Sequence, residues 1–246
     1  MSDSTTNDDQ HSDGPGFPRW LKWGLFAALA ILVVGYGLIF LYAKVLNDSP
    51  DELDEGDLDA ALSIDDPADE PPATDGSTWV VTDASELGYR VKEVLFGVDT
   101  DAVGRTNQVT GSLTISGTEV TDAEFVVDVA SITSDESRRD GQFAGRIMST
   151  DEFPTATFTL AEPIELGAEA AEGVEVTTTA TGEVTLRGVT NPVAFELTAK
   201  LENGKIGVLG SIPVVFADYN IANPSFGGVT TEDEGLLEFV LVFEPA

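Results

Sequence analysis

The residue types that carry out most enzyme chemistry are nearly missing from this sequence. It has no cysteine, and its one histidine, His11, lies in a polar N-terminal stretch. A Ser-His-Asp triad, a cysteine nucleophile, a disulfide and a histidine- or thiolate-rich metal site are therefore excluded from the rest of the chain. Carboxylates are abundant, but Asp151, Glu152 and Asp218 show no spacing that would pair an acid with a base. We expect no catalytic residue, no metal site and no cofactor.

The chemistry that remains is binding. Arg138, Arg139 and Arg146 lie close together in a very acidic sequence. A guanidinium can pair with an anionic or carbonyl head group, or it can form ion pairs that fix the local structure. The sequence favours the second role, because Arg139 stands beside Asp140. The three arginines are therefore head-group candidates and no more.

Aromatic and small apolar residues could form the wall of an apolar cavity. Eight of the phenylalanines after residue 120 are candidates, including Phe153 and Phe243. Each alone is typical of a plain core, but some of them must line any cavity that exists. The predicted lining consists of six of these phenylalanines and five residues from two predicted strands: Phe125, Phe143, Phe158, Ala180, Gly182, Val184, Leu186, Phe195, Leu197, Phe216 and Phe239.

These residues fall on segments in which apolar and polar residues alternate. From Val174 to Arg187 every second residue is apolar or small, and the residues between them are Glu, Thr or Arg. This period of two is typical of a strand with one buried and one wet face. After a break at Gly188–Pro192 the alternation resumes, and Asn203-Gly204 is typical of a two-residue hairpin turn.

The alternation recurs along residues 77–246 and gives about eight strands. An antiparallel sheet of that size tends to close into a barrel, because closure removes its edges. Ser134–Met148 has apolar residues at helical spacing and predicts a short helix over the barrel. The expected fold class is all-β, an eight-stranded antiparallel barrel with one short helix. Such a barrel is either filled by its own side chains or holds one small ligand, and periodicity leaves both open.

Four regions follow from composition. Residues 1–19 predict a disordered cytoplasmic tail. Residues 20–45 contain an uncharged run of 20 residues that predicts one transmembrane helix. Residues 46–76, acidic and with several prolines, predict a disordered linker, and a short partner-binding helix there is the less favoured alternative. Residues 77–246 predict the barrel, and the charges around the helix favour an extracytoplasmic position for it.

The charge is strongly negative, with 44 acidic and 12 basic residues and a net charge of −32. Nucleic acid and anionic lipid surfaces should repel such a chain. We therefore expect no nucleic-acid partner. Solubility explains the acidity more simply than a specific basic partner does.

Several short motifs occur in a characteristic order along the folded region. They are TWVV from Thr78, YRV from Tyr89, GSLTI from Gly111, AEFVVDVASITS from Ala123, Arg139-Asp140, STDEFPTATF from Ser149, and GEVTLRGVTNPVAFEL from Gly182. In order and spacing, residues 78–246 resemble the YceI-like family of lipocalin-like, polyisoprenoid-binding proteins. The resemblance implies an extended eight-stranded barrel around a long apolar tunnel, with an isoprenoid or other long-chain amphiphile as ligand.

The favoured function is therefore that of a membrane-anchored, extracytoplasmic binding protein and not of an enzyme. A long prenyl chain needs a continuous apolar tunnel, because each buried CH₂ contributes about 0.8 kcal/mol. The alternative is a structural or interaction module whose barrel is filled and whose surface or linker does the work. Enzymatic carboxylate chemistry is the weakest of the three.

Overall fold

The computed structural model describes residues 19–41, 49–63 and 77–246. It contains two compact units, one with the first helix and one that extends from residue 47 to residue 246.

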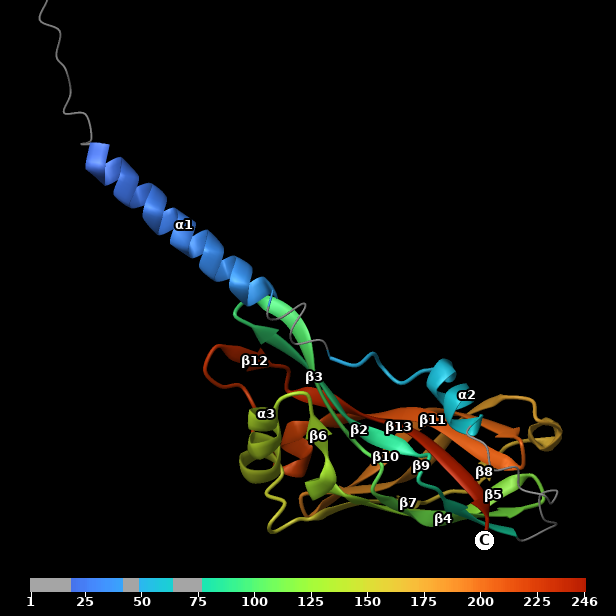
Figure 1. Cartoon of the computed structure of the whole chain (residues 1–246). Coiled ribbons are helices and arrows are strands. Elements are labelled where there is room, and N and C mark those ends of the chain that lie inside the picture. The colour runs from blue at the N-terminus through green and yellow to red at the C-terminus, as the bar shows by residue number, and fades with distance from the viewer. Residues whose placement is uncertain (1–18, 42–48, 64–76) are drawn as a thin grey trace, which may run out of the picture. The chain divides into compact units, whose positions relative to one another are not determined.

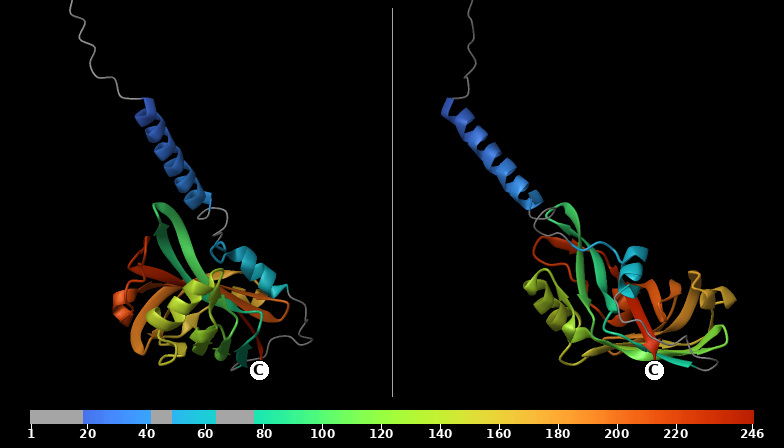
Figure 2. Two further views of the ribbon diagram at one scale, coloured as in Figure 1. Left: turned by 60° about the vertical axis from the view of Figure 1, so that its left-hand side comes forward. Right: turned by 45° about the vertical axis from the view of Figure 1, so that its right-hand side comes forward.

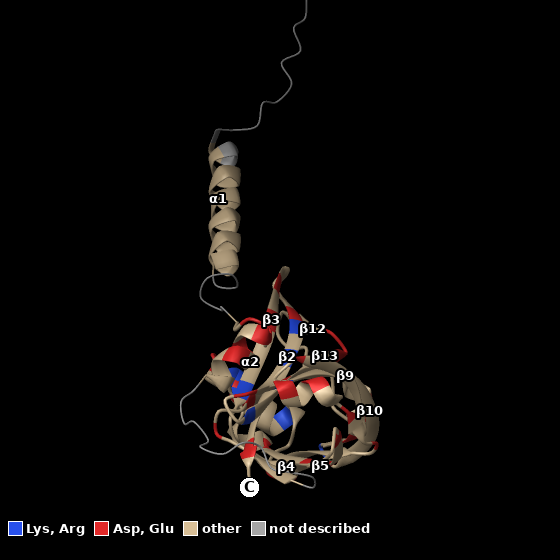
Figure 3. Cartoon of the chain, turned by 90° about the vertical axis from the view of Figure 1, so that its right-hand side faces the viewer, with Lys and Arg blue, Asp and Glu red and all other residues tan. Residues whose placement is uncertain are grey.

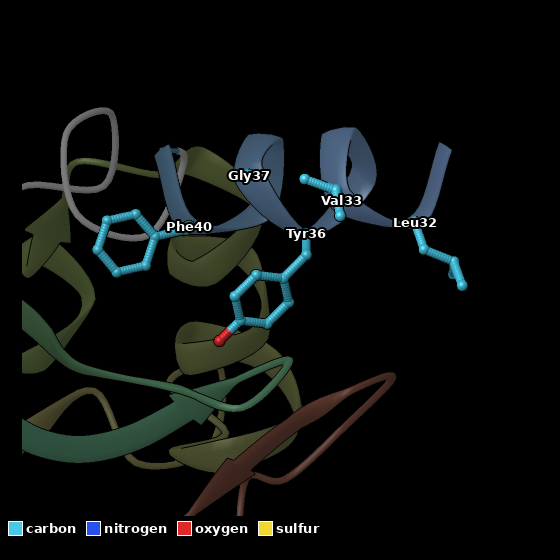
Figure 4. A pocket seen from close by; sticks show the side chains of 5 residues that line it. All are labelled: Leu32, Val33, Tyr36, Gly37 and Phe40. Atoms are coloured by element: carbon cyan, nitrogen blue, oxygen red, sulfur yellow. The ribbon is translucent and has the colours of Figure 1, made fainter. Parts of the chain in front are cut away.

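The first unit is built on one apolar helix, α1 (Arg19–Leu41). Its 23 residues span about 34 Å at the rise of an α-helix, slightly more than the hydrocarbon core of a bilayer. By length and composition Trp23–Leu41 could cross a membrane. A shallow apolar groove runs along one face of the helix where Gly37 has no side chain, between neighbours one helical turn apart (Figure 4): Leu32, Val33, Tyr36 and Phe40.

The second unit is dominated by a single antiparallel sheet (Figure 1). Its strands are β1 (Ser77–Val81), β2 (Glu86–Leu95), β3 (Val98–Thr106), β4 (Val109–Ser116), β5 (Glu119–Asp128), β6 (Thr133–Ser134), β7 (Thr155–Leu160), β8 (Ile164–Glu165), β9 (Val176–Leu186), β10 (Val189–Glu202), β11 (Lys205–Val215), β12 (Val229–Thr231) and β13 (Glu234–Pro245).

The sheet closes on itself. The order β1-β4-β5-β7-β9-β10-β11-β13 returns to its start because β13 also pairs with β1. One edge of β13 pairs with β2 at Leu236–Val240 and with β1 further along, so β1 and β2 act as one interrupted strand. β3 and β4 likewise follow one another along β2 and β1. The predicted eight-stranded closed barrel is confirmed, and Figure 2 shows it from two further sides.

Two-residue turns set the register of the long hairpins. Asn203 and Gly204 both have positive φ, 52° and 74°, as the predicted turn requires. The turn between β9 and β10 is Arg187-Gly188, also with positive φ at both residues. The expected break at Gly188–Pro192 is thus wrong beyond Gly188, because Thr190, Asn191 and Pro192 already pair with β9.

The main core lies inside the barrel, where the inward residues of all eight strands meet. One side of it is covered by α3 (Ser137–Gln142) and the π-helical turn η3 (Phe143–Ile147), which together form the predicted short helix. Short 3₁₀ turns complete the unit: η2 (Val129–Ser131), η4 (Ala168–Glu172) and η5 (Phe216–Tyr219).

A second, smaller core lies on the outside of the barrel and corrects the prediction of a disordered linker for residues 49–63. The rest of the predicted linker and the tail predicted before residue 19 lie outside the described residues. Residues 49–63, here called the strap, contain α2 (Glu55–Leu62), which begins with a capping box at Asp54. Leu58 and Leu62 are 0% and 1% exposed and pack on Val240 and Val242 of β13. An acidic peptide of this length would not hold a helix alone. Burial against the barrel supplies the missing stability.

The strap also covers a buried ionic cluster. Glu238, 1% exposed, accepts hydrogen bonds from Arg90 Nε at 3.2 Å and Arg105 Nη2 at 2.8 Å. The same two guanidiniums donate to the Pro50 and Asp51 carbonyls of the strap at 2.8 and 2.7 Å. Buried charges need such partners. The strap carbonyls supply two of them, so the strap belongs to the folded unit.

Candidate binding site in the barrel interior

A belt of phenylalanine rings runs around the inner wall of the barrel. It begins at Phe243 on β13, crosses β5, β7 and β10, and returns to β13. Successive ring centroids lie 5.5, 6.2, 5.7 and 5.9 Å apart, in the order Phe243, Phe125, Phe158, Phe195 and Phe239. Contacts in this range are favourable for aromatic pairs. We call these five residues the aromatic belt.

Most rings of the belt lie against small residues of a neighbouring strand. Phe125 is paired in register with Gly111, Phe195 with Ala180, and Phe239 with Gly210. A Cβ atom built on Gly210 would lie 2.7 Å from the Phe239 ring, and one on Gly182 would lie 2.5 Å from the Phe158 ring.

The rings therefore pack over these small residues, which have no large side chain to exclude them. Sequence reasoning placed Ala180 and Gly182 in the lining because small side chains leave space. In the structure the ring of Phe158 takes the space beside Gly182. A ring seated in this way lies along the wall and reaches less far into the interior.

Several inward-facing side chains keep partial exposure. Phe125, Phe158 and Phe239 are only half-buried although they pack on the main core, as do Val193 and Leu237. A barrel filled completely by its own side chains would bury these positions. The remaining predicted lining residues are buried members of the same core: Phe143, Ala180, Val184, Leu186, Phe195, Leu197 and Phe216.

The end of the interior next to α3 is polar. Arg139 of α3 lies 3.6 Å from Glu93 of β2 and also pairs with Asp135. Burial raises the pKa of the Glu93 carboxyl, and the Arg139 charge opposes that shift. Tyr89 stacks on Phe143 with ring centroids 4.7 Å apart, and burial raises the pKa of its hydroxyl. We call Tyr89, Glu93 and Arg139 the polar end.

Only one of the three candidate arginines belongs to this polar end. Arg138 is exposed on α3. Arg146 is exposed and donates to the Pro224 carbonyl at 2.9 Å, so it holds the loop before β12. Arg139 forms ion pairs with Glu93 and Asp135, while the carboxylate of Asp140, expected as its partner, accepts hydrogen bonds from Ser134.

Sequence reasoning did not place Tyr89, Glu93, Gly111 or Gly210 in the site, although Tyr89 and Gly111 begin two of the motifs listed above. A signal for Glu93 was present, because it follows Tyr89 and Val91 at alternate positions of one strand and so places a charge on the inward face. Gly111 could have been matched to Phe125 across a hairpin. The contact of Gly210 with Phe239 joins strands that are not hairpin neighbours, and needed the structure.

The described residues offer no group of three or more His, Asp or Glu side chains that could hold a metal ion. Asp151, Glu152 and Asp218 are all exposed. The groove on α1 belongs to the other unit and has no part in the barrel interior.

Comparison with known proteins agrees with this architecture. A family model described as YceI-like domain matches residues 79–243. A polyisoprenoid binding domain from Saccharophagus degradans superposes with a TM-score of 0.53 at 18% identity, over 68% of this chain and 98% of that one. BcnA from Burkholderia cenocepacia gives 0.51 at 20% identity, over 66% and 98%. No curated protein sequence matches this chain.

Proposed function

This chain belongs to the YceI-like domain family, and we propose that its barrel holds the hydrocarbon chain of an isoprenoid or another long-chain amphiphile. The observation that carries the proposal is the aromatic belt, in which Phe125, Phe158 and Phe239 stay partly exposed inside a closed barrel. Pockets for apolar ligands are lined by such aromatic and aliphatic side chains, with few polar groups. The structural relative from Saccharophagus degradans, a polyisoprenoid binding domain, supports the same ligand class.

The polar end gives the ligand a direction. Arg139 and Glu93 offer a donor and an acceptor at one end of an otherwise apolar interior. A polar head group would be held there, while the chain extends along the belt. The apolar part supplies most of the affinity, because each buried CH₂ contributes about 0.8 kcal/mol. Arg138 and Arg146 lie outside this arrangement.

The second part of the proposal is that α1 is a single-pass membrane anchor. Its length matches a bilayer core. Arg19 and Lys22 precede the apolar run and Lys44 follows it, which favours a cytoplasmic N-terminus and an extracytoplasmic barrel. An anchored binding protein would stay beside the membrane from which a lipid ligand comes.

The test is native mass spectrometry of residues 47–246, purified without detergent and then extracted with solvent. The fragment has to start at 47, because removal of the strap would expose Val240 and Val242. We expect an added mass that is released on denaturation and identified as a prenyl or other long-chain lipid. An apo mass that takes up no added prenyl lipid would show a filled barrel and favour a function on the surface.

A matched pair of variants localises the ligand. Val193 and Ala194 are neighbours on β10; Val193 packs on the interior core, and Ala194 is exposed. Val193→Trp should fill the interior beside Gly182 and abolish the added mass. Ala194→Trp, an even larger increase in volume on the other face, should leave it unchanged. Equal loss in both variants would place the lipid elsewhere.

A further inference from the structure

Two turns with the sequence Phe-Gly come together beyond one end of the barrel. Phe96-Gly97 joins β2 to β3, and Phe226-Gly227 precedes β12. The Phe96 amide donates to the Gly228 carbonyl at 3.0 Å, and a Cβ on Gly228 would lie 2.4 Å from the Phe96 ring. β12 also pairs with the last residues of β2. The two turns therefore form one structural element.

This element exposes large apolar side chains to solvent. Phe226 is 70% exposed, Phe96 55% and Val94 37%. Apart from α1, the described residues include five exposed large hydrophobics, and these are three of them; the other two, Val174 and Val215, are on other elements. A cluster of this kind is typical of an interaction surface. We call Val94, Phe96 and Phe226 the apolar tip.

The backbone of the tip adopts an unfavourable conformation at Phe96. Phe96 has φ of +49°, a conformation that costs a bulky residue about 1–2 kcal/mol and that Gly or Asn would adopt more easily. Since more than half of the Phe96 side chain is exposed, packing within the barrel offsets little of this cost. The two-residue turn requires positive φ at this position, as it does at Arg187, but it does not require a bulky apolar residue there.

The chain brings the tip within reach of the proposed anchor. The strap begins where the Ser49 hydroxyl donates to the Asp101 carbonyl on β3. Asp101 is five residues from Phe96 along the hairpin, about 17 Å at the rise of a strand. From the last residue of α1, Leu41, to Ser49 there are eight peptide steps, at most about 28 Å of extended chain. The docked strap therefore limits the distance between the end of α1 and the tip far more than the flexible linker predicted for residues 46–76 would.

We propose that the apolar tip inserts into the surface of the lipid bilayer that α1 spans, and that this bilayer surface is uncharged or zwitterionic. The exposed carboxylates of Asp99, Glu232 and Asp233 lie beside the tip in sequence and outnumber the exposed Lys92, two residues from Val94. The local charge therefore disfavours an anionic surface. Glu93 of the polar end is three residues from Phe96, so insertion presents the polar end of the barrel to the membrane. The inference rests on the proposed anchoring by α1.

Depth measurements with spin labels test the inference, and the absence of native cysteine makes single labels straightforward. Full-length Phe96→Cys and Phe226→Cys variants, each retaining the other aromatic residue, are labelled with a nitroxide in phosphatidylcholine vesicles. Val174→Cys is the control, because Val174 is a half-exposed apolar residue elsewhere on the barrel unit. Leu32→Cys on α1 reports the anchor itself.

We expect labels at 96 and 226 to lose collisions with a water-soluble nickel chelate and to gain collisions with oxygen, while the label at 174 remains water-accessible. Tip labels as accessible as the one at 174, beside a buried label at 32, would overturn the inference and leave the anchor intact. An exposed label at 32 would overturn the anchor and the inference with it. Neither result depends on the lipid content of the barrel, which mass spectrometry measures separately.

Discussion

At the scale of single residues, the interior depends on glycine as much as on phenylalanine. Gly210 and Phe239 face one another across β11 and β13, and the ring fills the place of a side chain at Gly210. Glycine in a strand weakens the strand, so it is retained where another group approaches closely. Here the group that approaches is a ring of the aromatic belt.

Gly210→Val should push the Phe239 ring away from the wall and into the interior. We expect the variant to lose bound lipid or to select a shorter chain, and to lose about 1–3 kcal/mol of unfolding free energy through overpacking. Native mass spectrometry and urea denaturation measure the two effects. Unchanged lipid content would mean that the ring at Phe239 does not limit the cavity.

The carboxyl of Glu93 predicts a pH dependence. Burial raises its pKa above the ordinary value of 4.5, with Arg139 acting in opposition. The folded state thus binds the proton more tightly than the unfolded chain, and stability is gained as the pH falls through the raised pKa and lost as the pH rises again. Below the ordinary value both states are protonated and the effect levels off.

Glu93→Gln should remove this dependence. The unfolding free energy of the native protein, relative to that of the variant, should rise between about pH 7 and about pH 4.5. Urea titrations of both proteins at the two pH values measure it. A constant difference, or one that falls with decreasing pH, would contradict the raised pKa.

At the scale of elements, the strap docks on the outer face of the barrel. Gly207 of β11 faces outwards, three residues from the inward-facing Gly210. A Cβ on Gly207 would lie 2.5 Å from Leu58 and 2.9 Å from Leu62. Lys200 adds an ion pair to Asp59 at 2.7 Å. The strap therefore has little room to accommodate a side chain beneath α2.

Gly207→Val should displace α2 while the barrel stays folded. The loss cannot exceed the docking energy of the strap, to which the burial of Leu58 and Leu62 contributes about 1.5–3 kcal/mol each. Hydrogen exchange should show loss of protection at residues 55–62. Gly210→Val is the control on the same strand, and should affect the ligand without releasing α2. Retained protection would show that the strap tolerates the side chain.

The strands could be predicted from sequence because alternation is a local signal, and the Asn203-Gly204 turn for the same reason. The docking of α2 could not be predicted from sequence, because the helix is stabilised by contacts with β13, almost 200 residues further along the chain. A partial sign was present in Phe239–Phe243, where Val240 and Val242 make the outward face apolar as well. Apolar side chains on an outward face indicate that another segment packs on them. The position of Glu93 and the small residues beneath the aromatic belt could not be predicted either. They depend on the register between strands, which a single sequence indicates only across short turns.

At the scale of the whole molecule, the net charge determines which surfaces repel the protein. Residues 77–246 carry 28 acidic and 9 basic residues, a net charge of 9 − 28 = −19, and acidic positions are spread around the barrel (Figure 3). The strap binds three of those nine cations, Arg90, Arg105 and Lys200. Exposed basic groups remain at Lys92, Arg138 and Arg146, but the 28 acidic residues far outnumber them.

Anionic lipid should therefore weaken contact of the apolar tip with the bilayer. With phosphatidylglycerol added to the vesicles, the label at Phe226→Cys should become more accessible to the nickel chelate, because the bilayer repels the acidic domain. Salt should reverse the change, since the Debye length is about 10 Å at 0.1 M and shorter above it. The label at Leu32→Cys should not respond, because a spanning helix keeps its depth. A tip label that sinks deeper with anionic lipid would instead point to a basic contact and contradict the selection of an uncharged surface.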